Sequence, residues 1–343
     1  MNDARELLSE DGMAIVMLCS QLALGDERDV TALSLKEWNA LAQKIGASDL
    51  KRPSALLGVG AQELARELGL VPSDAERIVL LLTRGGTMAL ELENLADTGI
   101  WCVTRADGAY PPRIRKTLKH RAPPVLFGAG ELTILDQPTI AVVGSRNLEA
   151  SGEAFARQLG AMCARASVTV VSGGARGTDR ISMQAGLDSG GHAAGVLADS
   201  LSKSIRQPDV RELVADGRLV MLTPYRPYNG FSVGAAMGRN KIVYGAADYA
   251  VIVSSDYQKG GTWAGAIEAL QADWCPVFVR SDANVATGNK QLVKKGALPI
   301  SDVELGGTED IVEWMKTRAG LRMKQPELLS GMMSRELLPE RGC

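Results

Sequence analysis

Hydrophobic positions follow two different patterns along the chain and divide it into a helical first part and an alternating second part. In residues 1–82 apolar side chains recur at the three- and four-residue spacing of a helix. Ser34 and Ser73 each stand where a helix N-cap would be, and Glu37 completes a capping box with Ser34. We therefore predict a small N-terminal helical domain over residues 1–82.

Residues 83–136 have the pattern of a connecting subdomain. Residues 87–98 fit a short helix, and residues 99–104 fit a short strand. Two proline pairs then interrupt any longer element, so we expect a loop-rich connection that ends at residues 125–128.

From Pro138 onward the repeating order of strand, glycine turn and helix predicts a doubly wound α/β domain over residues 137–305. The apolar runs are short and do not alternate, as in strands buried on both faces of a mostly parallel sheet. They are Ile140–Val143, Val168–Val171, Ala194–Leu197, Leu219–Leu222, Tyr249–Val253 and Val277–Val279. Amphipathic stretches predict helices at 150–165, 179–189, 204–216, 233–246 and 262–272. Residues 306–343 are expected to hold one helix, at 309–317, and a polar tail.

Composition sets limits on the class of protein. Of the 343 residues, 45% are hydrophobic and 23% are charged, which excludes a disordered chain. The 38 basic and 40 acidic residues leave a net charge of -2, so any nucleic-acid binding must rest on local charge. No apolar run is long enough to span a bilayer, and acidic residues before the run at 13–19 argue against a secretory signal.

Cysteine and histidine content narrows the chemistry. The five cysteines are scattered and form no CxxC pair, which predicts reduced thiols in a cytoplasmic protein. There are only two histidines, His120 and His192. We therefore expect no metal site, no cofactor and no catalytic histidine triad.

The first turn that could carry chemistry is Gly144-Ser145-Arg146, between the first strand of the α/β domain and the helix at 150. Gly144 lets the backbone approach a ligand closely, and free N–H groups at the helix start favour a phosphate. Ser145 can donate a hydrogen bond, and Arg146 can hold phosphate oxygens in a fork. An ordinary turn with a solvated arginine explains this segment equally well.

A second turn, Ser172-Gly173-Gly174-Ala175-Arg176-Gly177-Thr178-Asp179, again joins a strand to a helix. Its glycines and hydroxyl side chains are typical of an anion-binding nest, with Ser172, Gly173, Gly174, Arg176 and Gly177 as the candidate contacts. It contains neither the GxGxxG dinucleotide fingerprint nor a Walker motif. We interpret Asp179 as a charge at the helix start and not as a catalytic group.

Two further motifs complete the set. Arg239-Asn240-Lys241 lies inside a predicted helix, and because its two cations are two residues apart, they cannot fully share one face. Lys259-Gly260-Gly261-Thr262 is a third glycine turn. Three such turns at the ends of one sheet, with cations beside them, predict a phosphate-rich ligand, either a nucleotide or a nucleic-acid backbone.

In these four motifs the chain resembles the DNA-processing protein A (DprA/Smf) family, and the resemblance runs from about Leu81 to Trp314. The family's Gly-Ser-Arg, Ser-Gly-x-Ala-Arg-Gly-x-Asp, Arg-Asn-Arg and glycine–serine-rich turns occur here in the same order. Residues 107–111 are similar to its Tyr-Pro element, and Gly288-Asn289 is similar to one of its closing turns. The departures are Met183 in place of a histidine, Lys241 in place of the second arginine, Ser254-Ser255 in place of Glu-Ala, and a missing C-terminal winged helix.

The resemblance implies an extended Rossmann-like fold in which the four motifs line a pocket for single-stranded DNA. It also implies a homodimer and a recombinase partner. Divergent relatives occur in anti-phage or toxin–antitoxin operons, which adds a co-encoded toxin or effector as a candidate partner. The N-terminal helices and the tail around Glu327-Leu328-Leu329 and Met332-Met333 would then be the contact surfaces.

Three hypotheses of function follow. The first is a non-enzymatic, sequence-tolerant binder of single-stranded DNA, with Phe231, Tyr228 and Trp263 as candidate stacking residues that core packing explains equally well. The second is a nucleotide sensor or a nucleotide phosphoribohydrolase-like enzyme, faintly indicated by Glu268 after the third turn. The third is a regulator of a co-encoded toxin. We adopt the first hypothesis, with the third as a compatible setting.

Overall fold

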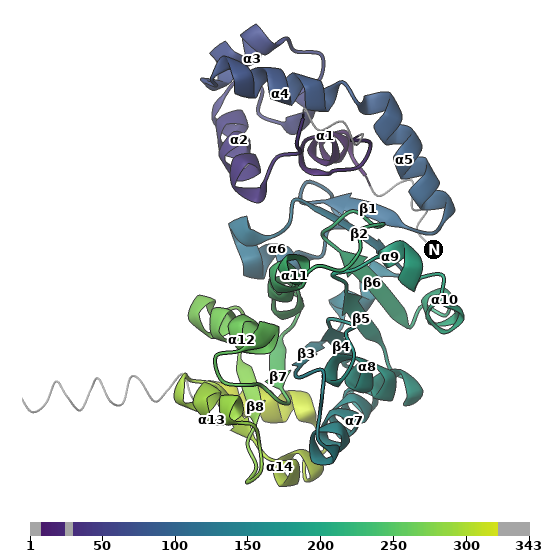
Figure 1. The fold of residues 1–343 in the computed structure, drawn as a ribbon, viewed down its shortest axis with the longest axis vertical. Helices are drawn as coiled ribbons and strands as arrows, with labels where there is room; N and C mark the ends of the chain where they lie inside the picture. Colours follow the sequence, from purple (N-terminus) through teal and green to yellow (C-terminus); the bar gives the residue numbers. More distant parts are fainter. Residues whose placement is uncertain (1–7, 25–29, 322–343) are drawn as a thin grey trace, which may run out of the picture.

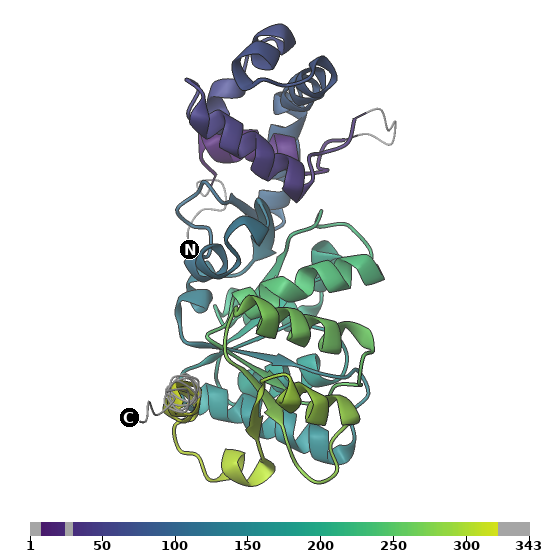
Figure 2. The ribbon, with the colours of Figure 1, turned by 90° about the vertical axis from the view of Figure 1, so that its left-hand side faces the viewer.

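The computed structural model describes residues 8–24 and 30–321, and the predicted tail contacts at 327–333 lie outside these residues. A group of helices forms one end of the molecule, and a sheet covered by helices forms the rest (Figures 1 and 2). Among the described residues no helix is long and apolar enough to cross a membrane.

The N-terminal end of the described chain is helical, as predicted. The Ser34–Glu37 capping box is present, with the Ser34 hydroxyl accepting from the Glu37 N–H and the Glu37 carboxylate accepting from the Ser34 N–H. The prediction for Ser73 is wrong, because Val71 is the N-cap and Pro72 takes the first helical position. The helices are α1 (Glu10–Cys19), α2 (Leu35–Ala47), the 3-10 turn η1 (Pro53–Leu56), α3 (Ala61–Leu68), α4 (Pro72–Leu82) and α5 (Gly85–Asp97).

The sheet has nine strands in the order β1-β2-β6-β5-β4-β3-β7-β8-β9. The seven strands from β6 to β9 are parallel, while β2 runs antiparallel to both of its neighbours, β6 and the edge strand β1, which confirms the mostly parallel α/β class. The strands are β1 (Trp101–Thr104), β2 (Val125–Ala129), β3 (Thr139–Val143), β4 (Thr169–Ser172), β5 (Ala193–Val196), β6 (Leu219–Thr223), β7 (Tyr249–Ile252), β8 (Val277–Arg280) and β9 (Leu298–Ile300).

Two strands differ from the sequence prediction. The end of the supposed loop-rich connection is the strand β2, which extends the sheet by pairing with β6. The edge strand β9 was not predicted at all, because it has three residues and Pro299 occupies its middle position. Proline is tolerated in a strand at a sheet edge, where the missing N–H faces outward.

The five helices predicted between the strands of the α/β domain match the structure with one correction, and the helices at 112–118, 287–294 and 302–306 were not predicted. The single helix expected at 204–216 is broken into two, because Pro208 begins a new helix. The elements are α6 (Pro112–Leu118), η2 (Lys119–Arg121), η3 (Leu132–Asp136), α7 (Ala150–Arg165), α8 (Thr178–Asp188), α9 (Leu201–Ser204), α10 (Pro208–Ala215), α11 (Val233–Gly245), α12 (Gly260–Ala272), α13 (Thr287–Lys294) and α14 (Asp302–Gly306). Residues 311–321 are also helical.

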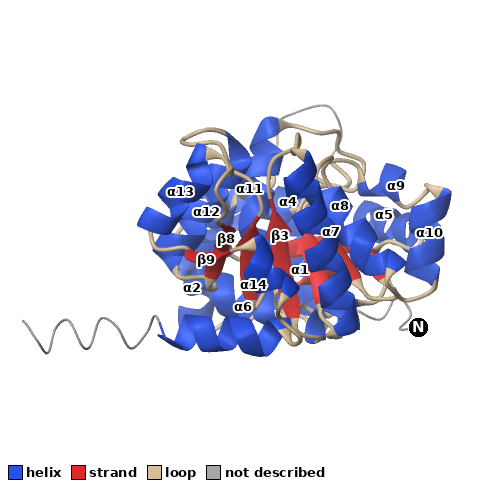
Figure 3. Ribbon diagram, turned by 90° about the horizontal axis from the view of Figure 1, so that it is seen from below, coloured by secondary structure: helices blue, strands red, loops and turns tan. Residues whose placement is uncertain are grey.

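Helices cover both faces of the sheet (Figure 3). On one face, Phe155 of α7 and Leu187 of α8 belong to a hydrophobic core that continues into the N-terminal helices. On the other face, Ile242 of α11 and Ala266 of α12 belong to a second core. Because the parallel strands between them are buried on both sides, their sequences are continuously apolar, as predicted.

Asp107 joins the N-terminal helices to the sheet. One oxygen of its buried carboxylate accepts hydrogen bonds from the Ser9 N–H at 2.8 Å and the Ser9 hydroxyl at 2.6 Å, at the N-cap of α1. The other oxygen accepts from the Thr104 N–H and hydroxyl, both at 2.7 Å, at the end of β1.

The division of the chain into domains at residues 82, 136 and 305 stays a prediction.

Candidate functional site

The three glycine turns lie at the point where the strand order of the sheet reverses. The chain leaves β3 on one side, through β4, β5 and β6, and returns on the other side of β3 as β7. The loops after β3 and β7 therefore diverge, and ligands of open α/β sheets bind at such a point.

The turn after β3 is clamped between its two neighbours. The Ser145 N–H donates to the Ser254 carbonyl at 2.9 Å, and the Ser145 carbonyl accepts from the Thr178 N–H at 3.2 Å. A β-carbon at Gly144 would lie 2.3 Å from the Thr178 hydroxyl oxygen, so only glycine fits. The Ser145 hydroxyl accepts from the Asn147 N–H and stabilises the turn itself.

The turn after β4 packs directly on the turn after β3. Gly177 has a φ of +89°, and a β-carbon there would lie 2.5 Å from the Arg146 carbonyl oxygen. The Ser172 hydroxyl is buried and donates to the Val142 carbonyl at 2.6 Å, so it positions the turn and does not face solvent. Arg176 is exposed at the top of this turn. Its guanidinium donates to the Asn147 side chain at 3.1 Å, which connects the two turns.

Arg239 of α11 lies beneath the second turn, almost completely buried. A β-carbon at Gly173 would overlap its guanidinium, so the bare backbone of Gly173 packs on that group. Burial lowers the pKa of Arg239, and the charges of Asp179 and Asp199 act in the opposite direction. Arg239 therefore supplies positive charge from below the turn, while the exposed cations lie above it.

Asp179 is a buried carboxylate at the start of α8. Burial raises its pKa to about 6, although the Arg239 charge and hydrogen bonds from the backbone of the turn favour the ionised form. The Ala175 N–H donates to it at 3.4 Å. Its contacts fit the interpretation of a structural charge at the helix start, with Arg239 as its counterpart.

α11 bridges the second and third turns. The Asn240 amide donates to the Gly261 carbonyl at 3.1 Å, one residue along from the arginine under the second turn. Lys241 lies on another side of the helix, where the nearby charges are those of Glu268 and Arg121. Glu268 itself forms an ion pair with Arg121 at 3.7 Å. The structure thus separates the two cations of the motif, as their spacing predicts, and brings Lys241 to none of the turns.

The third turn presents a lysine and an aromatic pair. Lys259 is the exposed N-cap of α12, and Gly260 has a φ of +74° in open surroundings. Thr262 is half-buried in the first turn of the helix. Trp263 packs edge to face with the exposed Tyr257, their ring centroids 5.1 Å apart. The sequence reading missed Tyr257, which lies in a loop without any pattern.

Two of the predicted stacking residues are surface residues. Phe231 is 53% exposed, and the Arg146 guanidinium lies over its ring, 5.2 Å from the centroid. Tyr228 is 44% exposed, but the charges near it are those of Glu91, Arg226 and Arg206. Of these two rings, Phe231 is the one placed beside the first turn.

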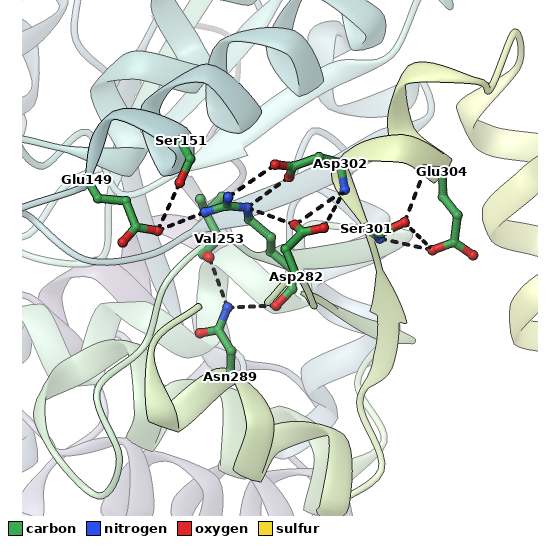
Figure 4. A network of polar contacts seen from close by, with 9 residues as sticks. Glu149, Ser151, Val253, Asp282, Asn289, Ser301, Asp302 and Glu304 are labelled. Atoms are coloured by element: carbon green, nitrogen blue, oxygen red, sulfur yellow. Dashed lines mark hydrogen bonds and ion pairs between the residues drawn. The ribbon is translucent and has the colours of Figure 1, made fainter. Parts of the chain in front are cut away.

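Asn289 fixes the end of β7 from below (Figure 4). Its amide donates to the Val253 carbonyl at 3.0 Å and to the Arg280 carbonyl at 2.9 Å, and its carbonyl oxygen accepts from the Ser255 N–H at 2.8 Å. A β-carbon at the neighbouring Gly288 would lie 2.1 Å from the Ser255 carbonyl oxygen. The Gly288-Asn289 motif is therefore a structural support for the third turn.

Arg280 ties the supports together. Its buried guanidinium forms ion pairs with Asp302 at 2.9 Å, with Glu149 at 3.0 Å and with Asp282 at 3.3 Å (Figure 4). Glu149 is the N-cap of α7 and Asp302 begins α14, so one side chain links three elements at this end of the sheet. The sequence reading missed this residue, since a single arginine at a strand end carries no signal.

The structure gathers most of the predicted residues at the strand ends. They are Gly144, Ser145, Arg146, Ser172, Gly173, Gly174, Arg176, Gly177, Arg239, Asn240, Lys259, Gly260, Gly261 and Thr262. Their role in binding stays a prediction. Within residues 8–24 and 30–321, no cluster of three or more His, Cys, Asp or Glu side chains is placed to hold a metal ion.

A doubly wound sheet with glycine turns at its switch point and no GxGxxG fingerprint defines the chain as a Rossmann-like α/β protein. The family is shown by comparison with known proteins. The model of the family "DNA recombination-mediator protein A" matches residues 101–313, more than half of the chain. The chain belongs to this family.

Individual relatives agree with this assignment. The DNA processing protein DprA of Mycobacterium tuberculosis H37Rv is 29% identical over 272 residues, 75% of this chain. The chain spans 66% of that protein's length, just under two thirds. DprA of Bacillus subtilis is 29% identical over 179 residues, which are 51% of this chain and 59% of that protein. The crystal structure of DprA from Streptococcus pneumoniae superposes with a TM-score of 0.55 at 18% identity, covering 80% of this chain and 98% of that one, and shows the same fold.

Gly288→Ala is expected to destabilise the fold by about 2 kcal/mol, because the added methyl group would force the Ser255 carbonyl to move. Urea unfolding followed by circular dichroism measures the change. Gly46→Ala is the control, since a β-carbon there meets nothing within 4 Å. This second change should raise stability by about 0.5–1 kcal/mol. Equal effects of the two substitutions would contradict the role of Gly288.

Asp179 should make stability depend on pH. Burial raises the pKa of the Asp179 carboxyl from 3.8 to about 6 in the folded state. At pH values between these two, the carboxyl is protonated in the folded protein and ionised in the unfolded protein. The contribution of this group is therefore fully present at low pH and falls as pH rises, by about 3 kcal/mol in all.

Asp179→Asn removes this titration. The difference in unfolding free energy, variant minus wild type, should rise between pH 5 and pH 7.5, whatever constant offset the substitution adds. Urea unfolding at four pH values measures it. Parallel curves for the two proteins would contradict the buried, titrating carboxylate.

Proposed function

We propose that the protein is a non-enzymatic binder of single-stranded DNA that acts in DNA processing and recombination. The observation that carries the proposal is the exposed Arg146, which lies over the Phe231 ring at the first turn of the switch point. A cation beside an exposed aromatic ring can hold a phosphate and stack a base at the same place.

The surroundings of Arg146 favour an extended, negatively charged ligand. Arg176 and Lys259 are also exposed at the other two turns, so three turns each offer a cation. The starts of α7, α8 and α12 lie just after these turns, so the positive ends of three helix dipoles point toward them. Such groups bind the phosphate backbone of a nucleic acid and do not distinguish between bases.

Membership of the recombination-mediator family supports the choice of DNA as ligand. Homodimerisation, a recombinase partner and a co-encoded toxin or effector in an anti-phage setting stay predictions. The cytoplasmic location expected from the sequence is a prediction as well.

The alternative of a nucleotide sensor or a phosphoribohydrolase-like enzyme finds less support. Glu268, its candidate carboxylate, is ion-paired with Arg121 and lies beside Lys241, away from the three turns. We therefore expect no release of free base from nucleoside monophosphates, measured by chromatography after prolonged incubation. Release that is abolished by Glu268→Ala would favour the enzyme instead.

Arg146→Ala tests the proposal without disturbing the core, whereas substituting the buried Arg239 would also affect folding. We expect affinity for single-stranded oligothymidine to fall about fivefold at about 0.15 M salt, and the salt slope to fall by about 0.7, as one phosphate contact is lost. Fluorescence anisotropy at several salt concentrations measures both quantities.

Arg66→Ala on α3 is the matched control, because it removes an exposed arginine far from the strand ends along the chain. It should leave affinity and slope unchanged. An Arg146→Ala protein that binds as tightly as the wild type would overturn the proposed site.

A further inference from the structure

A second basic feature lies beside the switch-point turns, between the first turns of α7 and α8. It is a cleft of about 530 Å³ lined by residues of both helices and of the turns that precede them. Its lining includes four arginines, which are Arg146, Arg157, Arg176 and Arg180. Among the described residues that line it, Glu153 is the one acidic side chain.

The packing of α7 on α8 leaves the cleft open at this end. Farther along, the helices touch through their backbones, since a β-carbon at Gly160 would lie 2.3 Å from the Ser182 carbonyl oxygen. Nearer the N-termini, Arg157 of α7 and Arg180 of α8 line the cleft. The two helices run side by side next to β3 and β4 (Figure 1).

The cleft holds four arginines and only one carboxylate, that of Glu153, among its described lining residues. Some arginines elsewhere in the described chain form ion pairs with carboxylates, as in Arg52–Asp11 and Arg77–Glu37. In residues 8–24 and 30–321, by contrast, no carboxylate lies within ion-pair distance of any of the four cleft arginines. The positive ends of two helix dipoles add to the same potential.

The charge is distributed along the cleft instead of converging on one point. Arg176 lies in the turn before α8 and Arg180 in the first turn of that helix, while Arg157 lines the cleft from α7. Arg146 and Arg176 also belong to the first two turns, so the cleft continues directly from the proposed DNA site. Arg157 and Arg180 lie outside all four motifs of that site.

We propose that this cleft binds the phosphates of single-stranded DNA where the strand leaves the switch-point turns. The inference rests on the proposed function. It extends that function by proposing the path of the bound strand, which would run from the turns into the cleft between α7 and α8. Arg157 and Arg180 would each neutralise a phosphate that the turns do not reach.

The test compares the Arg157→Ala/Arg180→Ala double variant with the wild type on oligothymidines of about 6 and about 20 nucleotides, the first within and the second beyond the usual site sizes of about 4–16 nucleotides. Affinity for the long oligonucleotide should fall about tenfold at about 0.15 M salt, and the salt slope should fall by about 1.4. Affinity for the short oligonucleotide should stay within twofold. Arg165→Ala/Arg211→Ala is the control, with the same charge change at exposed positions that do not line the cleft. Thermal unfolding checks that all variants fold.

The outcomes separate the two ideas. Unchanged affinity of the double variant for the long oligonucleotide overturns the cleft while leaving the proposed function in place. An equal loss on both lengths also overturns it, because the arginines would then act within the turns. Failure of the wild type to bind either oligonucleotide overturns the proposed function and the inference together. If instead polyglutamate binds the wild type and not the double variant while DNA binding is unchanged, the cleft docks an acidic protein segment and not DNA.

Discussion

Contact of backbone against backbone holds the whole functional end of the sheet. The turn after β4 touches the turn after β3 through Gly177, which packs on the backbone of Ser145 and Arg146, and α13 touches the turn after β7 through Gly288. Each contact leaves no room for a β-carbon, so glycine at these positions lets three loops from distant parts of the chain meet. Interactions between side chains could not set such short separations, because side chains adjust and backbones do not.

The charges at this end form two layers with different tasks. The buried groups lie beneath the turns. Arg239 supports one turn, and Arg280 links three elements through its ion pairs with the carboxylates of Glu149, Asp282 and Asp302. Exposed arginines and a lysine lie above and have few partners of their own. A buried charge needs its partners to offset desolvation, whereas an exposed charge left unpaired remains available to a ligand. A net charge near zero is therefore compatible with a strongly basic surface in one place.

Much of this organisation could be predicted from the sequence, and the features that could not be predicted share identifiable physical reasons. Continuous apolar runs located six strands, and glycine next to a hydroxyl or basic residue located the three turns, because both signals are local. Strands β2 and β9 were not predicted as strands, because β2 follows a proline pair and β9 contains Pro299. The inward position of Ser172 and the supporting role of Asn289 depend on contacts between residues far apart in the chain, which no local pattern carries.

The proline in β9 has a consequence for how copies of this protein could associate. At the open edge of a sheet, unpaired N–H and C=O groups invite a strand from another molecule. In the described part of the chain this edge is three residues long, and its middle residue has no N–H to offer. Joining two molecules into one continuous sheet is thereby disfavoured at this edge. An assembly formed there would need to bring helices or loops together instead of strands.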